Sequence, residues 1–271
     1  MAEEVSTHKP VANSVLISLS SFGAAEVRRH GQLWFAHLAF EAGADGVEVR
    51  SELLLDAASE LPAISQAARQ AGKNLVYSCA DYLWTPEGGI DHQALDQAIK
   101  AAKLLGAPRL KMAIGSFSQQ SHTSLTALQA RLHQAKVELV IENDQTAEAG
   151  SLAAMLAFFD AANSQGIFFG LTFDMGNWHW VGECPLQAAA ALSAQVTYVH
   201  CKGVQRQPPR WVAVPVAESS AAWRAVLRAL PATAPWAIEY PLVGDDLLAV
   251  TRREIEQLRR VAASMATHQT L

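Results

Sequence analysis

The feature that most constrains the fold of this 271-residue chain is the regular alternation of two kinds of segment. Eight short runs rich in β-branched and aromatic residues are each followed by a longer stretch with the apolar spacing of a helix. The strand-like runs begin at Val15, Gly46, Asn74, Arg109, Val137, Phe168, Val196 and Trp236, and the helical patterns cover residues 24–42, 59–71, 91–105, 121–135, 151–165, 185–193, 219–229 and 246–264. Strands and helices in strict alternation are joined by right-handed crossovers into a parallel sheet.

Eight such units predict an α/β fold whose sheet closes into a single (β/α)8 barrel, the TIM-barrel architecture. We expect one domain over residues 1–271, with residues 1–13 as a flexible tail, because chains of this length commonly form one barrel. The alternative is an open doubly wound sheet, which usually has a glycine-rich turn after its first strand; the corresponding segment, SLSSFGAAE, has none. The stretch from Gly203 to Ser220 is expected to be a long loop that could cover an active site.

Composition excludes several classes of function. The formal charge is -5 and the basic residues are scattered, so there is no basic face for nucleic acid. Three cysteines without paired spacing indicate a reducing compartment rather than a disulfide framework or a zinc ribbon. The acidic, polar start is unlike a signal peptide, and no long apolar run follows. We therefore expect a cytoplasmic protein with a small-molecule partner and no membrane or nucleic-acid partner; a homo-oligomer stays open.

Four side chains of metal-ligand type stand at the ends of the last four strand-like runs: Glu142, Asp174, His200 and Glu239. In a parallel barrel the carboxyl ends of the strands converge at the active site. Any one of these residues could instead stabilise a helix terminus or pair with a basic residue, but four on consecutive strands favour a metal site. Three carboxylates and one imidazole suit Mn²⁺ or Mg²⁺, with Co²⁺ or Zn²⁺ as alternatives.

Five segments resemble those of a known family: GADGVEVR, IENDQT, LTFDMGNWHWVGE, YVHCKG and AIEYPL. The chain resembles the xylose isomerase-like superfamily of barrels, which includes ketose 3-epimerases, isomerases, dehydratases and an apurinic endonuclease. It is also similar to epimerases associated with 2-ketogluconate utilisation. The resemblance implies one metal held by Glu142, Asp174, His200 and Glu239. It further implies that Glu142 and Glu239 form the catalytic acid/base pair on opposite faces of the substrate.

The activity implied by this resemblance is a metal-dependent isomerase or epimerase of a small ketose or keto sugar acid. A proton would be removed next to a metal-bound carbonyl, through an enediolate. The alternative is a dehydratase on the same scaffold, in which loss of a hydroxyl group follows the same proton abstraction. An apurinic-endonuclease-type enzyme fits less well, because the third and fourth strands end without histidine. A non-catalytic barrel fits less well too, because all four ligands are retained.

Four further charged residues are candidates for substrate binding near the strand ends. Lys111 and Lys202 could stabilise enolate or carboxylate charge; Lys111 could equally be a rim lysine with its ammonium in solvent. Glu48 and Arg50 share one face of the second strand, where they could contact substrate hydroxyls or pair with each other.

Three loop residues are also candidates for substrate binding. Asn177 follows Asp174 by three residues, where many relatives have a substrate-contacting histidine, and His179 follows by five. The two could share that role, or substrate contacts could differ; His179 could also be a packed loop histidine. Arg210, in the long loop, could bind an acid or phosphate group or simply be solvated.

Overall fold

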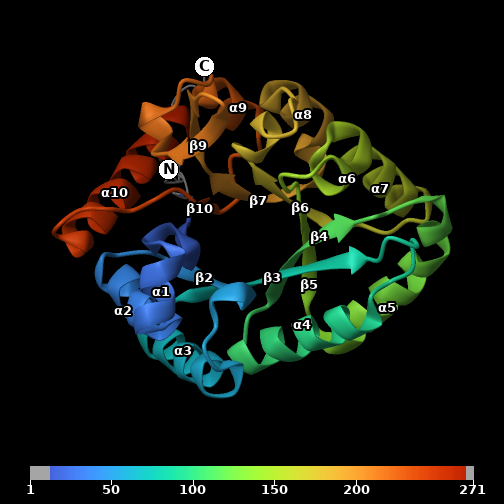
Figure 1. Ribbon diagram of the computed structural model, residues 1–271, viewed down its shortest axis with the longest axis horizontal. Coiled ribbons are helices and arrows are strands. Elements are labelled where there is room, and N and C mark those ends of the chain that lie inside the picture. The colour runs from blue at the N-terminus through green and yellow to red at the C-terminus, as the bar shows by residue number, and fades with distance from the viewer. Residues whose placement is uncertain (1–12, 267–271) are drawn as a thin grey trace, which may run out of the picture.

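The computed structural model describes residues 13–266, and within that range eight parallel strands form a closed barrel (Figure 1). The strands are β1 (Val15–Ser18), β2 (Gly46–Arg50), β3 (Asn74–Trp84), β4 (Arg109–Gly115), β5 (Glu138–Glu142), β6 (Gly170–Asp174), β7 (Val196–Cys201) and β10 (Trp236–Ile238). The barrel closes where β10 pairs with β1. The predicted (β/α)8 architecture is therefore confirmed. Of the predicted tail, residues 1–12 lie outside the described residues, and Asn13 donates a hydrogen bond to the carbonyl of Ala234 at 3.1 Å.

The helices surround the barrel in chain order, and the last one lies beside the first ones (Figure 1). They are α1 (Ala24–His30), α2 (Gln32–Glu41), α3 (Ala57–Ala71), α4 (His92–Leu105), α5 (Leu125–Ala135), α6 (Ala147–Gly150), α7 (Leu152–Ser164), α8 (Pro185–Leu192), α9 (Trp223–Ala229) and α10 (Leu247–Ala266). Among residues 13–266, no helix has the length and apolar composition needed to cross a membrane.

The helical pattern expected over residues 24–42 is divided into two helices at Gly31. Gly31 has a φ of 80°, which a residue with a side chain adopts only with strain. The carboxylate of Glu60, on α3, accepts hydrogen bonds from the backbone N–H groups of Gln32 and Leu33. It thereby satisfies donors that the first turn of α2 leaves free. The break turns the chain between β1 and β2 while both helices stay packed on the barrel.

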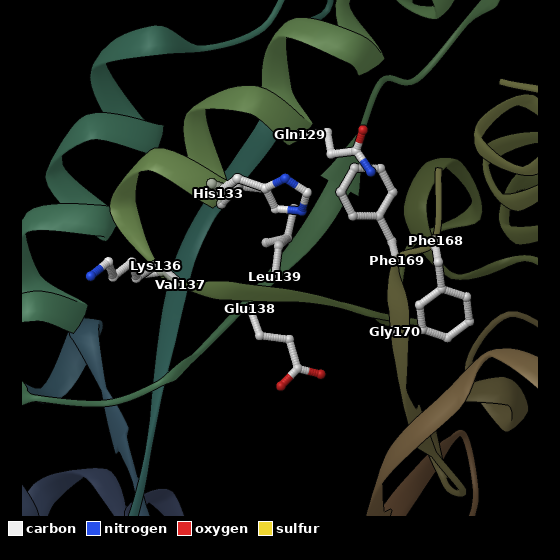
Figure 2. A pocket seen from close by; sticks show the side chains of 10 residues that line it. Gln129, His133, Lys136, Val137, Glu138, Leu139, Phe168, Phe169 and Gly170 are labelled. Carbon is white, nitrogen blue, oxygen red and sulfur yellow. The ribbon is translucent and has the colours of Figure 1, made fainter. Parts of the chain in front are cut away.

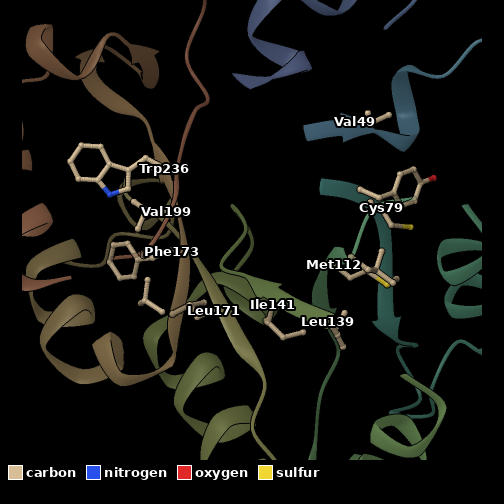
Figure 3. Close-up of a cluster of buried hydrophobic side chains, with 14 of the residues drawn as sticks. Val49, Cys79, Met112, Leu139, Ile141, Leu171, Phe173, Val199 and Trp236 are labelled. Carbon is tan, nitrogen blue, oxygen red and sulfur yellow. The ribbon is translucent and has the colours of Figure 1, made fainter. Parts of the chain in front are cut away.

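Side-chain alternation along the strands divides the apolar residues into two groups. Residues such as Val49, Ile141 and Phe173 belong to the large core between the strands and the helices, part of which is drawn in Figure 3. A second cluster, inside the barrel, consists of Leu16, Val76, Tyr198 and Ala237. The next inward positions toward the carboxyl ends are polar, because Ser18, Glu48, Lys111 and His200 are all buried there. The barrel interior is therefore apolar near its amino-terminal end and charged near the other.

The stretch from Gly203 to Ser220 is not the loop expected from its proline content. It contains an antiparallel hairpin, formed by β8 (Gly203–Gln207) and β9 (Arg210–Val214). Pro208 and Pro209 occupy the turn, where a missing N–H group costs nothing, and the flanking valines and Trp211 favour extended backbone. The hydroxyl groups of Ser219 and Ser220 donate to the carbonyl of Val204, and the Val204 N–H donates to Ser219 Oγ. These bonds tie the base of the hairpin to the segment that follows it.

Close contact between β2 and β3 yields a stability prediction. A methyl group at Gly46 would collide with the backbone carbonyl of Asn74, whereas one at Gly89 would meet only Thr85 Oγ1, at an ordinary contact distance of 4.0 Å. We expect Gly46→Ala to destabilise the protein by about 1–3 kcal/mol, because neither backbone can move without breaking the sheet. Gly89→Ala is the matched control and should change stability by less than about 1 kcal/mol. Urea unfolding of both variants tests this; equal stability would contradict the packing argument.

Candidate metal centre

The four ligand-type side chains predicted from the sequence converge at the carboxyl end of the barrel. Glu142 and Asp174 are the last residues of β5 and β6, and His200 stands beside Asp174 on β7. Glu239 directly follows β10, where its backbone N–H donates to the carbonyl of Cys201 at 3.3 Å. One donor atom from each of the four residues lies within 4.8 Å of the others. Parallel pairing of neighbouring strands is what brings these distant residues to one place.

His200 stands at the middle of this cluster and is fully buried. Its Nδ1 atom lies 2.8 Å from Glu142 Oε1, 2.9 Å from Glu239 Oε2 and 3.7 Å from Asp174 Oδ2. Its Nε2 atom lies 2.8 Å from Oε2 of the buried Glu48. A carboxylate on one ring nitrogen orients the imidazole and leaves the other nitrogen to face the three carboxylates.

Two cationic side chains, one buried and one largely buried, contact the glutamate oxygens that point away from His200. Lys111 donates to Glu142 Oε2 at 2.6 Å, and Arg50 donates to Glu239 Oε1 at 2.8 Å. Both cations also contact Glu48 Oε1, at 3.1 and 3.2 Å respectively. Lys111 is therefore not a rim lysine, since its side chain is 1 % exposed. Glu48 and Arg50 do pair with each other, and both also support the cluster.

Asp174 is fixed by the loop that follows it and by Asn143. Its Oδ1 accepts hydrogen bonds from the backbone N–H groups of Gly176 and Asn177, at 2.7 and 2.8 Å. The amide of Asn143 bonds to the backbone N–H and carbonyl of Asp174, at 2.9 and 3.1 Å. Asn143 was not singled out from the sequence, although a polar residue directly after Glu142 at the end of a buried strand was a usable signal.

Lys202 directly follows β7 and reaches the cluster with only 9 % of its side chain exposed. Its Nζ lies 2.7 Å from Asp174 Oδ2 and 2.8 Å from Glu239 Oε2, and it donates to Asn177 Oδ1 at 3.0 Å. The same Asn177 oxygen accepts a hydrogen bond from Gln145 at 3.0 Å. Asn177 therefore shapes the loop and positions Lys202.

The surroundings keep the two glutamates ionised. Burial by itself would raise the pKa of Glu142, but the positive charges of Lys111 and His200 lower it below its usual value. Burial opposes ionisation of Glu239 as well, yet His200 and Lys202 hold its pKa well below the ordinary range. Both carboxylates are therefore unprotonated at neutral pH and able to accept a proton.

Asp174 and His200 are shifted in the opposite direction. The pKa of Asp174 is raised, because burial outweighs the attraction of Lys202. Burial disfavours the charged form of His200, but Glu239 and Glu48 raise its pKa well above the usual value. A raised pKa favours the protonated form of each group. Protonation reduces the net negative charge of the cluster, which the basic residues of the protein do not fully balance.

The four ligand-type residues suit a divalent cation in three respects: their net charge, the spacing of their donor atoms, and the presence of oxygens without hydrogen-bond donors. A metal with bonds of about 2.0–2.2 Å separates its ligand atoms by roughly 3–4.4 Å, close to the spacing observed here. Glu142 Oε1 and Asp174 Oδ2 are buried and accept no hydrogen bond from the described residues. The ion-pair network contains five carboxylates (Glu48, Glu52, Glu142, Asp174, Glu239) and three basic residues (Arg50, Lys111, Lys202). An imidazole that binds a metal is neutral, so in the metal-bound state one divalent ion would balance the remaining two negative charges.

The other predicted contact residues lie in different surroundings. His179 packs its ring against Trp211 of the hairpin at 4.9 Å, and burial lowers its pKa, so the ring is neutral. Its Nε2 is buried without a hydrogen-bond partner among the described residues. Arg210 is exposed at the turn of the β8–β9 hairpin, so the structure does not bring it to the cluster. Gln32, which the sequence did not bring to attention, bonds to both backbone groups of Arg50 at 2.8 Å.

A separate cavity of about 370 Å³ lies at the other end of the barrel (Figure 2). It is lined by the end of α5 and the first residues of β5 and β6, including His133, Glu138 and Phe168. None of the four ligand-type residues lines it. The chemistry is therefore expected at the carboxyl end, where active sites of these barrels lie.

Comparison with solved structures shows the same fold in several enzymes. The D-allulose 3-epimerase from a Methylomonas species is 16 % identical (TM-score 0.64), and the alignment covers 93 % of this chain and 98 % of that one. The probable 3-DHS dehydratase AsbF from Bacillus anthracis is 14 % identical (TM-score 0.67), with 90 % and 98 % covered. The 3-keto-D-glucoside 4-epimerase YcjR from E. coli is 14 % identical (TM-score 0.61), with 92 % and 99 % covered.

At such low identity these similarities establish the fold alone, and none supports a specificity for 2-ketogluconate. No protein of curated function matches the sequence significantly. The model of one protein family, however, matches residues 36–261, which include all four ligand-type residues. The chain therefore belongs to the xylose isomerase-like TIM barrel family.

Proposed function

We propose that this protein is a divalent-metal-dependent isomerase or epimerase of a small ketose or keto sugar acid. The observation that supports this most is the pair of ionised glutamates in a cluster that fits one metal. Glu142 and Glu239 lie 2.8 and 2.9 Å from His200 Nδ1. Solved sugar epimerases share the fold, and one of them is described in complex with D-allulose. Glu142, Asp174, His200 and Glu239 would hold the ion, with Mn²⁺ or Mg²⁺ favoured by the mainly oxygen donors.

A bound divalent ion would polarise the carbonyl of a hydroxy-ketone and so acidify the hydrogen on the neighbouring carbon. The protein would supply the rest. One glutamate would accept that proton; the other, which is ionised in the metal-free protein, would take a proton from solvent and deliver it to the opposite face of the substrate. Lys111 and Arg50 bond to the outward oxygens of the glutamates and fix their orientation. Asp174 and His200 would act as ligands only, because backbone donors and Glu48 hold them in place.

A dehydratase is the second candidate, and two observations favour it over the remaining classes. A dehydratase shares the fold, and His179 is a neutral imidazole with an unpartnered Nε2 in the loop that follows Asp174. A neutral imidazole could donate a hydrogen bond to a departing hydroxyl group, which would leave as water with the proton that the glutamate abstracted. The two reactions differ in product, which is an isomeric sugar in one case and an unsaturated ketone in the other.

Metal removal should abolish the reaction. After dialysis against EDTA, we expect no exchange of the hydrogen next to the carbonyl when ketoses and keto sugar acids are incubated with the protein in D₂O. Added Mn²⁺ or Mg²⁺ should restore the exchange, with Co²⁺ and Zn²⁺ as comparisons. Proton NMR measures the exchange, and ultraviolet absorbance detects an enone if the enzyme is a dehydratase. Exchange at an undiminished rate without metal would refute the proposal.

Neutralising either glutamate should stop turnover without unfolding the protein. We expect Glu142→Gln and Glu239→Gln to lower kcat by at least about 10²-fold, because each replaces a proton-transferring carboxylate with an amide of the same size that cannot accept the proton. Glu138→Gln is the matched control: Glu138 lies on the same face of β5 but pairs with Arg109 at the far end of the barrel. Circular dichroism and metal content should be measured alongside. A glutamate whose removal leaves kcat unchanged has no role in proton transfer.

A further inference from the structure

Two of the three basic residues at the metal centre contact carboxylate oxygens that point away from it. Lys111 bonds to Glu142 Oε2, while Glu142 Oε1 lies 2.8 Å from His200 Nδ1. Arg50 bonds to Glu239 Oε1, while Glu239 Oε2 lies 2.9 Å from the same nitrogen. Lys111 and Arg50 therefore orient Glu142 and Glu239 without contacting the oxygens that would face a metal.

Lys202 contacts the other set of oxygens. Its Nζ lies 2.7 Å from Asp174 Oδ2 and 2.8 Å from Glu239 Oε2, which are two of the three oxygens that face His200 Nδ1. The contact with Asp174 is an ion pair without hydrogen-bond geometry, since Asp174 Oδ2 accepts no hydrogen bond from the described residues. The directed hydrogen bond of Lys202 goes to Asn177 Oδ1. The ammonium thus occupies the edge of the ligand cluster as a point charge.

The stem of Lys202 is confined by its packing. A methyl group at Gly176 would lie 2.8 Å from both Cγ and Cδ of Lys202, so the absence of a side chain there makes room for the stem. The side chain is 9 % exposed and cannot turn out to bulk solvent without moving this loop. Its ammonium can shift only over a short distance, between the carboxylates and Asn177.

We propose that the ammonium of Lys202 is an internal competitor of the metal ion, neutralising Asp174 and Glu239 in the metal-free protein and lowering the affinity for a divalent cation. This inference rests on the proposed metal-dependent function. Two cations that share the same two oxygens repel each other strongly inside a protein. On metal binding the ammonium would therefore withdraw toward Asn177, the partner that it already has.

Calorimetric titration of metal-free protein with MnCl₂ tests this directly. We expect Lys202→Met to bind Mn²⁺ about tenfold more tightly than the unmodified protein, since neighbouring groups tune metal affinity on this scale. Lys111→Met is the matched control: it removes another buried ammonium, but one on an outward oxygen, and should weaken binding by about tenfold. Equal or weaker Mn²⁺ binding by Lys202→Met would overturn the inference.

Thermal unfolding provides a second readout. In EDTA, Lys202→Met should unfold at a lower temperature than the unmodified protein, because Asp174 and Glu239 lose their counter-charge. Mn²⁺ should raise the unfolding temperature of Lys202→Met by more than it raises that of the unmodified protein. If this variant does not fold without metal, Lys202→Gln, which retains a polar group for Asn177, should show the same tightening. A metal-induced shift in the variant no larger than that in the unmodified protein would contradict the proposal.

The outcomes also separate this inference from the proposed function. If the unmodified protein binds none of Mn²⁺, Mg²⁺, Co²⁺ and Zn²⁺, both proposals fail. If the unmodified protein binds metal and His200→Ala does not, while Lys202→Met binds no more tightly, only the role of Lys202 is refuted.

Discussion

The arrangement of the site depends on the ion-pair network that surrounds His200 inside the barrel. Burying one uncompensated charge costs several kcal/mol, so a cluster of this kind persists only if each charge has a partner. Glu48 bonds to one nitrogen of His200 and, through its other oxygen, contacts Lys111 and Arg50. Those two cations in turn hold Glu142 and Glu239. Glu48 thereby links the imidazole to both proposed catalytic residues without being exposed itself.

The layered interior of the barrel explains why this network forms where it does. Leu16, Val76 and Tyr198 fill the space below it with apolar side chains, which exclude water from that side. Charges directly above such a layer attract and repel more strongly than charges in water. A modest imbalance between carboxylates and basic residues is then sufficient to favour a divalent cation. The same burial raises the pKa of Asp174, and the negative charge of Glu239 adds to this shift.

Family membership does not fix the reaction, which depends on the residues around the candidate metal centre. Sugar epimerases and a dehydratase are built on this same barrel at 14–16 % identity. A metal beside a pair of proton-transferring groups supports the first step of either reaction. In the proposed dehydration, the second step would depend on groups near the leaving hydroxyl. His179, whose ring packs against Trp211 of the hairpin, is the proposed group. These residues lie in connecting segments, which vary most readily within a fold.

The sequence by itself determined the fold and the four ligand-type residues. Period-two and helical patterns are local properties, and the end of a buried strand is recognisable from its neighbours along the chain. Lys111 and Glu48 were recognised as candidates, and so was the pairing of Glu48 with Arg50. The contacts of Lys111 with Glu142 and of Glu48 with His200 were not recognised, and Asn143 and Gln32 were missed. The hairpin was mistaken for a loop because two prolines hid its strand pattern. Only the tertiary structure decided which oxygen of each carboxylate faces His200. The reason is that contacts across the barrel join residues as far apart in the sequence as Glu48 and His200, and no local sequence pattern predicts such contacts.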